Sequence, residues 1–185
     1  MKRVLLFLVA ALSMTVASAQ TISYEGDITI LNSPIIYDTE IVYEDLMVND
    51  LPVDEFLQTM DEKFREAWST EIIPFAETIG HGMPTCINRK NVLDPENPTY
   101  KIVLTLNSLN LGSIGGIFNP FGTRKTGGSI IDGKMELFDA ATNDSVLLIT
   151  FNKIQGESDF SDSMRWALAY IDLAKKIKRT AKKAK

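Results

Sequence analysis

Residues Ser129–Ile154, SIIDGKMELFDAATNDSVLLITFNKI, give the clearest indication of fold class in this 185-residue chain. Apolar and polar residues alternate on both sides of a central polar turn, a pattern typical of two paired strands. We predict strands over 129–138 and 145–154 that form a hairpin, with 139–144 as a loop slightly longer than the tightest kinds. The expected inward side chains are Ile131, Met135, Leu137, Leu147, Ile149 and Phe151.

Strands are also predicted earlier in the chain. The alternation of Ile102, Leu104 and Leu106 indicates a strand over Tyr100–Leu106. Weaker extended patterns occur at Ser23–Leu31, which could equally be a loose lead-in, and at Ile41–Met47. Polar residues at outward positions favour a sheet with one face in water. These residues are Lys134, Glu136 and Lys153.

After the extended segment Ile41–Met47, the apolar residues recur at helical spacing. A first helix is predicted from 52–54 onward, because Pro52 suits a first helical turn. Its continuous apolar stripe consists of Val53, Phe56, Leu57, Met60, Phe64, Ala67 and Trp68. A second helical piece is expected from 69–71, with Pro74 either in its first turn or at a kink. We expect Gly80–Pro84 to end it.

A final helix is predicted to start at Ser161 or Asp162, since both are good N-cap residues. We expect it to run to about Lys185, with its last two turns leaving the core. Its predicted inner residues are Met164, Ala167, Leu168, Ile171 and Ala174. The order of elements predicts an α+β fold: a mostly antiparallel sheet of about four to five strands with two helices packed on one face.

The N-terminus has the layout of a secretory signal peptide. Lys2 and Arg3 precede an apolar run over Val4–Leu12, and the small residues Ala17-Ser18-Ala19 precede Gln20. The run is shorter than the roughly 20 apolar residues that span a bilayer. We therefore predict a signal peptide over 1–19, with an uncleaved anchor as the alternative, and a single domain over 20–185. That length suits one domain.

Charge and cysteine content add further expectations. The segment 25–77 holds fourteen acidic residues against Lys63 and Arg65, whereas the tail 175–185 holds seven basic residues and no acid. The tail could touch anionic partners, or its lysines could simply complement the negative end of a helix. Cys86 is the single cysteine, so no internal disulfide can form. We expect it to be a small buried residue, with an intermolecular disulfide as the alternative.

No familiar catalytic or metal motif is found in the sequence. His81 and Cys86 are the single histidine and the single cysteine, and a zinc site needs three or four protein ligands. The segment 122–126 lacks the glycine that precedes the lysine in a phosphate-binding loop. Three carboxylate pairs match helix starts or polar faces better than a glycosidase cleft. These are Asp54/Glu55, Asp61/Glu62 and Asp159/Asp162. We therefore predict no enzymatic activity, no metal and no cofactor.

The segment 112–128 combines six glycines with large apolar residues. One interpretation is a wide loop that folds its aromatic side chains back onto the sheet. The other is an exposed apolar loop that contacts a partner or a membrane surface, because exposed apolar clusters usually mark contact sites. The predicted contact surface runs over 114–125, and its proposed contact residues are Ile117, Phe118, Phe121, Arg124 and Lys125.

Several motifs resemble an uncharacterised family of exported proteins from Bacteroidetes. The motifs are Asp132-Gly133-x-Met135-x-Leu137-x-Asp139, Ile154-Gln155-Gly156-x-x-Asp159-Phe160-x-Asp162, Arg165-x-x-Leu168-Ala169-Tyr170, and Leu51-Pro52-Val53-Asp54-Glu55-Phe56-Leu57. The chain is more faintly similar to periplasmic domains of the curli-secretion lipoprotein and TolB N-terminal type. The resemblance implies an assembly or interaction domain. Unlike a secretion lipoprotein, the chain has no cysteine near the cleavage point to carry a lipid.

These observations predict an exported, non-enzymatic protein of the bacterial periplasm or outer membrane that acts as an interaction or assembly module. Its expected partner is an envelope protein or a membrane surface, and not nucleic acid, because the chain is mildly acidic overall. The alternative function is a periplasmic carrier of a small apolar molecule or lipid, held between the sheet and its helices.

Overall fold

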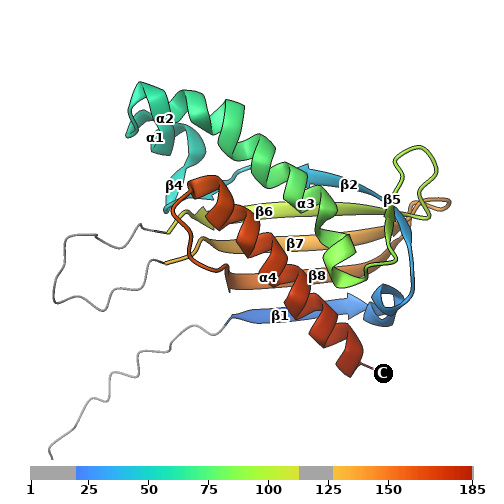
Figure 1. Ribbon diagram of the computed structural model, residues 1–185. Coiled ribbons are helices and arrows are strands. Elements are labelled where there is room, and N and C mark those ends of the chain that lie inside the picture. The colour runs from blue at the N-terminus through green and yellow to red at the C-terminus, as the bar shows by residue number, and fades with distance from the viewer. Residues whose placement is uncertain (1–19, 113–126, 185) are drawn as a thin grey trace, which may run out of the picture.

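The computed structural model describes residues 20–112 and 127–184 (Figure 1). The predicted signal peptide and the predicted contact residues from Ile117 to Lys125 lie outside the described residues. The strands are β1 Thr21–Gly26, β2 Ile36–Val42, β3 Met47–Val48, β4 Leu51–Pro52, β5 Val92–Leu93, β6 Tyr100–Asn110, β7 Ile130–Asp139 and β8 Ser145–Gln155. The helices are η1 Ile28–Asn32, α1 Val53–Gln58, α2 Glu62–Ala67, η2 Trp68–Ile72, α3 Ile73–Ile87 and α4 Asp162–Lys183.

The main strands form one mixed sheet in the order β1-β8-β7-β6-β2-β5. The pairs β1–β8, β8–β7 and β7–β6 are antiparallel, whereas β2 runs parallel to β6 and to β5. The long helices α3 and α4 lie side by side across one face of this sheet (Figure 1). The predicted α+β class, with a mostly antiparallel sheet and two helices on one face, is therefore confirmed.

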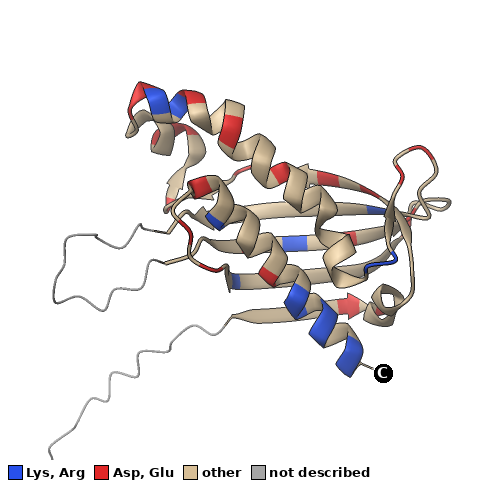
Figure 2. Ribbon diagram, in the orientation of Figure 1, with Lys and Arg blue, Asp and Glu red and all other residues tan. Residues whose placement is uncertain are grey.

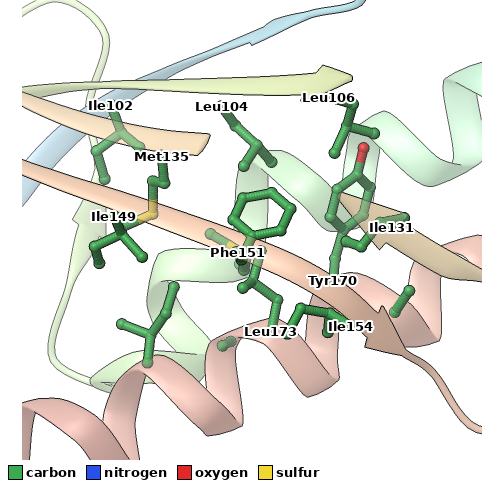
Figure 3. Close-up of a cluster of buried hydrophobic side chains, with 14 of the residues drawn as sticks. Ile102, Leu104, Leu106, Ile131, Met135, Ile149, Phe151, Ile154, Tyr170 and Leu173 are labelled. Atoms are coloured by element: carbon green, nitrogen blue, oxygen red, sulfur yellow. The ribbon is translucent and has the colours of Figure 1, made fainter. Parts of the chain in front are cut away.

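The predicted hairpin is confirmed as β7 and β8, and its inward residues form the centre of the core (Figure 3). Strand β6 runs to Asn110, beyond its predicted end at Leu106, and its pairing with β7 shifts between Leu106 and Ser108. A bulge of this kind inserts one residue and changes which side chains face inward. The alternation of Ile102, Leu104 and Leu106 consequently breaks, and Leu109 becomes the next buried residue.

The early extended segments differ from the prediction. Strand β1 ends at Gly26, and Ile28–Asn32 is a 3-10 helix in which Asp27 caps the backbone N–H of Thr29. The next strand is β2, which begins at Ile36, five residues before the predicted start. It contains alternately buried residues because it pairs with β6 inside the sheet.

The first helix is not continuous, which corrects the prediction. Helix α1 ends at Gln58, and Asp61 starts α2 by accepting a hydrogen bond from the Phe64 N–H at 2.8 Å. A π-helical turn, η2, then joins α2 to α3. A good N-cap side chain competes with the helical backbone at its own position, and Asp61 therefore ends one helix and begins the next.

Helix α3 continues through the predicted stop at Gly80–Pro84 and ends at Ile87. Pro74 lies in its first turn, as one alternative predicted. Gly80 lies at a close contact between elements, since a Cβ atom there would lie 2.6 Å from Cδ1 of Ile41 and 3.3 Å from the Tyr170 ring. The absence of a side chain lets α3 approach β2 and α4 closely.

Helix α4 begins at Asp162 with Ser161 as its N-cap, as predicted. The expectation that its last two turns leave the core is wrong, because Ile177 and Ala181 are fully buried. Near the C-terminal end, the side chain of Asn32 from η1 donates to the Ala181 carbonyl at 3.0 Å. Met164, expected inside, is exposed.

Cys86 was expected to be buried, but it is exposed on α3.

Exposed positions on β6, β7 and β8 carry the polar side chains expected of a sheet face in water, including Lys101, Lys134 and Lys153. The helix-covered face is therefore the packed side of the sheet.

Candidate functional site at the start of helix α4

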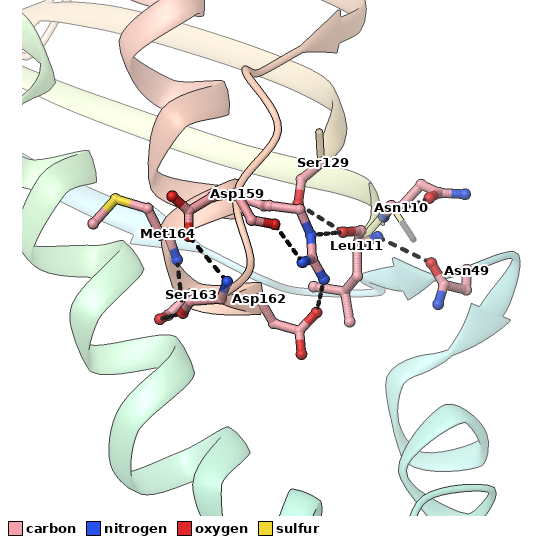
Figure 4. Close-up of polar contacts among 11 residues, drawn as sticks. Asn49, Asn110, Leu111, Ser129, Asp159, Asp162, Ser163 and Met164 are labelled. Carbon is pink, nitrogen blue, oxygen red and sulfur yellow. Dashed lines mark hydrogen bonds and ion pairs between the residues drawn. The ribbon is translucent and has the colours of Figure 1, made fainter. Parts of the chain in front are cut away.

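A buried arginine organises the loop before α4. Arg165 is only 2% exposed, and its guanidinium donates to the Leu111 carbonyl at 2.8 Å and to the Asp159 carbonyl at 2.8 Å. It also forms an ion pair with the Asp162 carboxylate (Figure 4). Arginine suits this position because its planar group carries five donors in a fixed geometry. One side chain therefore holds the residue that follows β6 and the loop before α4 together.

The same network holds both boundaries of the glycine-rich segment. The Ser129 hydroxyl donates to the Leu111 carbonyl at 3.1 Å, and the Leu111 N–H donates to Oδ1 of Asn49 at 3.0 Å (Figure 4). Gly112 has φ +74°, and a Cβ atom there would lie 2.1 Å from the Gly127 carbonyl oxygen. Only glycine combines this backbone conformation with so close an approach. The two chain ends that bound 113–126 are thus fixed beside Arg165.

Phe160 is the most exposed large apolar residue among those described, at 77%. Its neighbours on both sides are held in place. The Asp159 carbonyl accepts from Arg165 at 2.8 Å, and the Ser161 N–H donates to Oδ1 of Asp159 at 3.0 Å. The backbone at Phe160 is therefore fixed, while its ring lies in water.

The Phe160 ring borders a surface pocket of about 380 Å³ between α2, η2 and the start of α4, which we call the Phe160 pocket. Its apolar lining is Phe64, Ala67, Ile72 and Phe160, and its charged lining is Asp61, Lys63, Glu71 and Asp162. Three carboxylates against one lysine make the rim acidic. One of them, Asp162, is already paired with Arg165.

A row of aromatic rings lies close to the Phe160 pocket and connects α2 to α4. The ring centroids of Phe64 and Trp68 are 6.2 Å apart, and Trp68 stacks on Trp166 at 5.8 Å. Trp166 continues the row to Tyr170 at 6.3 Å. Trp68 belongs to the π-helical turn, a type of helix that is frequent at functional sites. The aromatic row gives the pocket a rigid support.

Tyrosine ionisation responds to this packing. Burial raises the pKa of Tyr170 well above the usual value for a phenol, and burial also raises the pKa of Tyr43, which packs against Trp166. On β2, burial raises the pKa of Tyr37 to about 12. These hydroxyls stay protonated at neutral pH.

The residues considered for chemistry from the sequence are dispersed. His81 and Cys86 both lie on α3, and no group of three metal-ligating side chains occurs among the residues that the structure describes. Two of the acidic pairs have structural partners, since Asp61 caps α2 and Asp162 pairs with Arg165. The residues proposed as partner contacts lie outside the described residues.

Sequence reasoning missed both Arg165 and Phe160. The signal for Arg165 was available, because Ala169, Leu173 and Ile177 follow it at intervals of four residues on the buried stripe. An arginine in that register predicts a buried, hydrogen-bonded guanidinium. The signal for Phe160 was an aromatic residue isolated among the polar residues of a short connection.

Neither the family models nor the curated proteins include a match to this chain. Among solved structures, the chain is similar to the PelC dodecamer from Paraburkholderia phytofirmans, with 12% identity and a TM-score of 0.45 over 84% of this chain and 96% of that chain. A variant of the same dodecamer has 13% identity and a TM-score of 0.37 over 84% of this chain and 95% of that chain. A structure described as an uncharacterized protein has 12% identity and a TM-score of 0.35 over 78% of this chain and 88% of that chain. The resemblance to exported Bacteroidetes proteins stays a prediction.

Across the residues that the structure describes, no helix has the length and apolar character needed to cross a bilayer.

Proposed function

We propose that this chain is an exported, non-enzymatic protein of the bacterial envelope that binds another envelope protein through the Phe160 pocket. The observation that carries the proposal is Phe160 itself, which is 77% exposed on a backbone fixed by Arg165. An aromatic ring held in water gains nothing for folding, whereas aromatic residues are frequent anchors in interfaces.

The lining of the Phe160 pocket defines the chemistry of the partner. Phe64, Ala67 and Ile72 offer an apolar surface for one inserted side chain. Asp61 and Glu71 at the rim favour basic groups beside that side chain. The proposed partner therefore presents an apolar residue flanked by lysine or arginine.

The glycine-rich segment belongs to the same proposal. Its boundaries, Leu111 and Ser129, are both tied into the Arg165 network that positions Phe160. We therefore propose that the contacts predicted from the sequence, among them Phe118 and Phe121, act together with Phe160 as one contact surface.

Export rests on the leader sequence. Strand β1 begins at Thr21, so cleavage after Ala19 would leave every described element in place. We expect the mature protein in the periplasm or at the outer membrane, with Gln20 at its N-terminus. N-terminal sequencing of the protein from fractionated host cells tests this, and intact Met1 in the cytosolic fraction would contradict it.

The binding proposal is tested with Phe160→Ser and a matched control, Val92→Ser. Both side chains are exposed, and Val92 lies on β5 at the other end of the sheet (Figure 1). Both variants should unfold within about 0.5 kcal/mol of the parent, as surface substitutions do. We expect Phe160→Ser to abolish co-purification of the envelope partner and Val92→Ser to retain it. Equal retention by both variants would refute the proposal.

The carrier alternative has a different requirement. An apolar ligand between sheet and helices would need space there, and this region is filled by buried side chains such as Leu104, Phe151 and Leu173 (Figure 3). The carrier function therefore stays a prediction from the sequence. Native mass spectrometry of protein from its own host separates the two, since a carrier would retain a small bound mass and an interaction module a polypeptide.

A further inference from the structure

Four basic side chains line one surface pocket where α3 and α4 end. The pocket has a volume of about 330 Å³ and includes Arg89 and Lys90 from the turn after α3, and Lys178 and Lys182 from α4. The two pairs are far apart in the sequence and are brought together by the fold. None of the described residues that line the pocket is acidic. We call it the basic pocket.

The four cations of the basic pocket have no carboxylate partners among the described residues, whose ion pairs involve Arg165 and Lys175. Lys178 and Lys182 are four residues apart on one helix, so they lie on the same face. Like charges placed this closely repel one another. A bound anion would relieve that repulsion.

Helix ends account for only part of this positive charge. The C-terminus of a helix carries about half a negative charge, and both α3 and α4 end at this pocket, at Ile87 and Lys183. Together the two ends offset roughly one of the four positive charges. The basic pocket thus keeps a positive excess within a chain whose net charge is −5, and Figure 2 shows the basic residues gathered at the end of α4.

The frame of the basic pocket is fixed by amide hydrogen bonds. The Asn32 side chain donates to the Ala181 carbonyl at 3.0 Å, and the Asn88 side chain donates to the Asn32 carbonyl at 3.3 Å. Buried Asn91 holds the turn by accepting from the Ile35 N–H and donating to the Pro84 carbonyl. The backbone carrying Arg89 and Lys90 is therefore held against α4.

We propose that the basic pocket binds a phosphate-bearing anion. Arg89 has the planar donor geometry for bidentate contact with phosphate oxygens, and the lysines supply additional positive charge. The floor contains the buried side chains of Leu31 and Ile87, which suits a ligand with an apolar portion beside its phosphate. This site is separate from the Phe160 pocket and does not depend on the proposed function.

The test uses the protein purified from its host and two probes. Inorganic pyrophosphate is titrated calorimetrically, and vesicles of phosphatidylcholine with and without phosphatidylglycerol are used for co-sedimentation. The test variant is Arg89→Gln/Lys178→Gln. Its control is Lys101→Gln/Lys134→Gln, which removes equal charge from exposed positions on β6 and β7. Thermal melts confirm that both variants are folded.

We expect the test variant to weaken binding at least about tenfold, the equivalent of one good contact, and the control to stay within about twofold of the parent. Pyrophosphate binding with this pattern identifies a free phosphate-bearing ligand. Binding only to phosphatidylglycerol vesicles, with the same pattern, identifies a lipid headgroup. The proposal is overturned if neither probe binds, or if both variants weaken binding equally.

Discussion

Replacing Arg165 with leucine tests whether one side chain holds the α4 start, β6 and the boundaries of the glycine-rich segment together. The substitution removes two hydrogen bonds of 2.8 Å to backbone carbonyls and the ion pair with Asp162. Among the described residues, the Ser129 hydroxyl would be the one side-chain donor left to the Leu111 carbonyl. The Asp159 carbonyl would lose its charged donor.

The expected cost follows from these contacts. A hydrogen bond to a charged group contributes about 1.5–3 kcal/mol, and Arg165 donates two of them to backbone carbonyls. The ion pair contributes less, because the Asp162 side chain is 31% exposed. The two hydrogen bonds together correspond to about 3–6 kcal/mol. Because leucine avoids the cost of burying a charge, which reduces this sum, we expect Arg165→Leu to lower the free energy of unfolding by about 3–5 kcal/mol. For a domain of this size each kcal/mol lowers Tm by about 2–4 °C.

Urea denaturation of matched variants provides the assay. Arg65→Leu is the control, because Arg65 donates to the Met60 carbonyl at 3.1 Å from an exposed position, and its loss should cost at most about 0.5 kcal/mol. Arg165→Lys should fall between the two, since an ammonium group cannot reproduce the planar fork. A loss below about 1 kcal/mol for Arg165→Leu would show that the network does not stabilise the fold.

Three further outcomes are expected. Gly80→Ala should destabilise the protein by about 1–3 kcal/mol through overpacking. Gly82→Ala should instead stabilise it by up to about 1 kcal/mol, because the added Cβ atom meets nothing within 4 Å. Urea unfolding that ranks the two variants in the reverse order would contradict the packing of α3. Ile177→Ala should cost about 2–5 kcal/mol because Ile177 is buried, and a neutral result would mean that the end of α4 is not packed. Stability should fall as the pH rises from 10 toward about 12, because the pKa of Tyr37 is raised from 10.0 to about 12 and the unfolded chain releases its proton first. Absorbance titration should show Tyr37, Tyr43 and Tyr170 ionising together with unfolding, and full ionisation of all tyrosines in the native state near pH 10 would contradict their burial.

The hairpin was predictable because its alternation is local. Residues such as Met135 and Ile149 face each other across β7 and β8, and the pattern of one strand alone indicates its inner face. The bulge in β6 was not predictable in this way, since the register shift at Ser108 depends on pairing with Asp132 across the sheet. The hydrophobic pattern of one strand does not indicate how its residues pair with those of another strand.

The helices show the same division between local and tertiary causes. Ser161 was identified as an N-cap from its side chain alone. Gly80 was misinterpreted as a helix end, because its role depends on the approach of Ile41 and Tyr170 from other elements. The last two turns of α4 were expected to leave the core because apolar residues become rare after Ile177, yet Ala181 is buried against η1.

The candidate site lay mostly beyond sequence reasoning. The Phe160 pocket is assembled from α2, η2 and the start of α4, and its position depends on the contacts of Arg165. The basic pocket similarly joins the turn at Arg89 to Lys178 on α4. Charge counting identified the basic tail, but only the fold shows which other cations it joins.

Site-specific photocrosslinking from position 160 in the source host tests the binding proposal most directly. A benzophenone amino acid replaces Phe160, and a second strain carries it in place of Val92, which is also exposed but lies on β5. We expect position 160 to yield one discrete crosslinked envelope protein that is absent from the control, and purified parent protein to compete for it. The same products from both positions, or none from position 160, would show that the partner does not bind at Phe160.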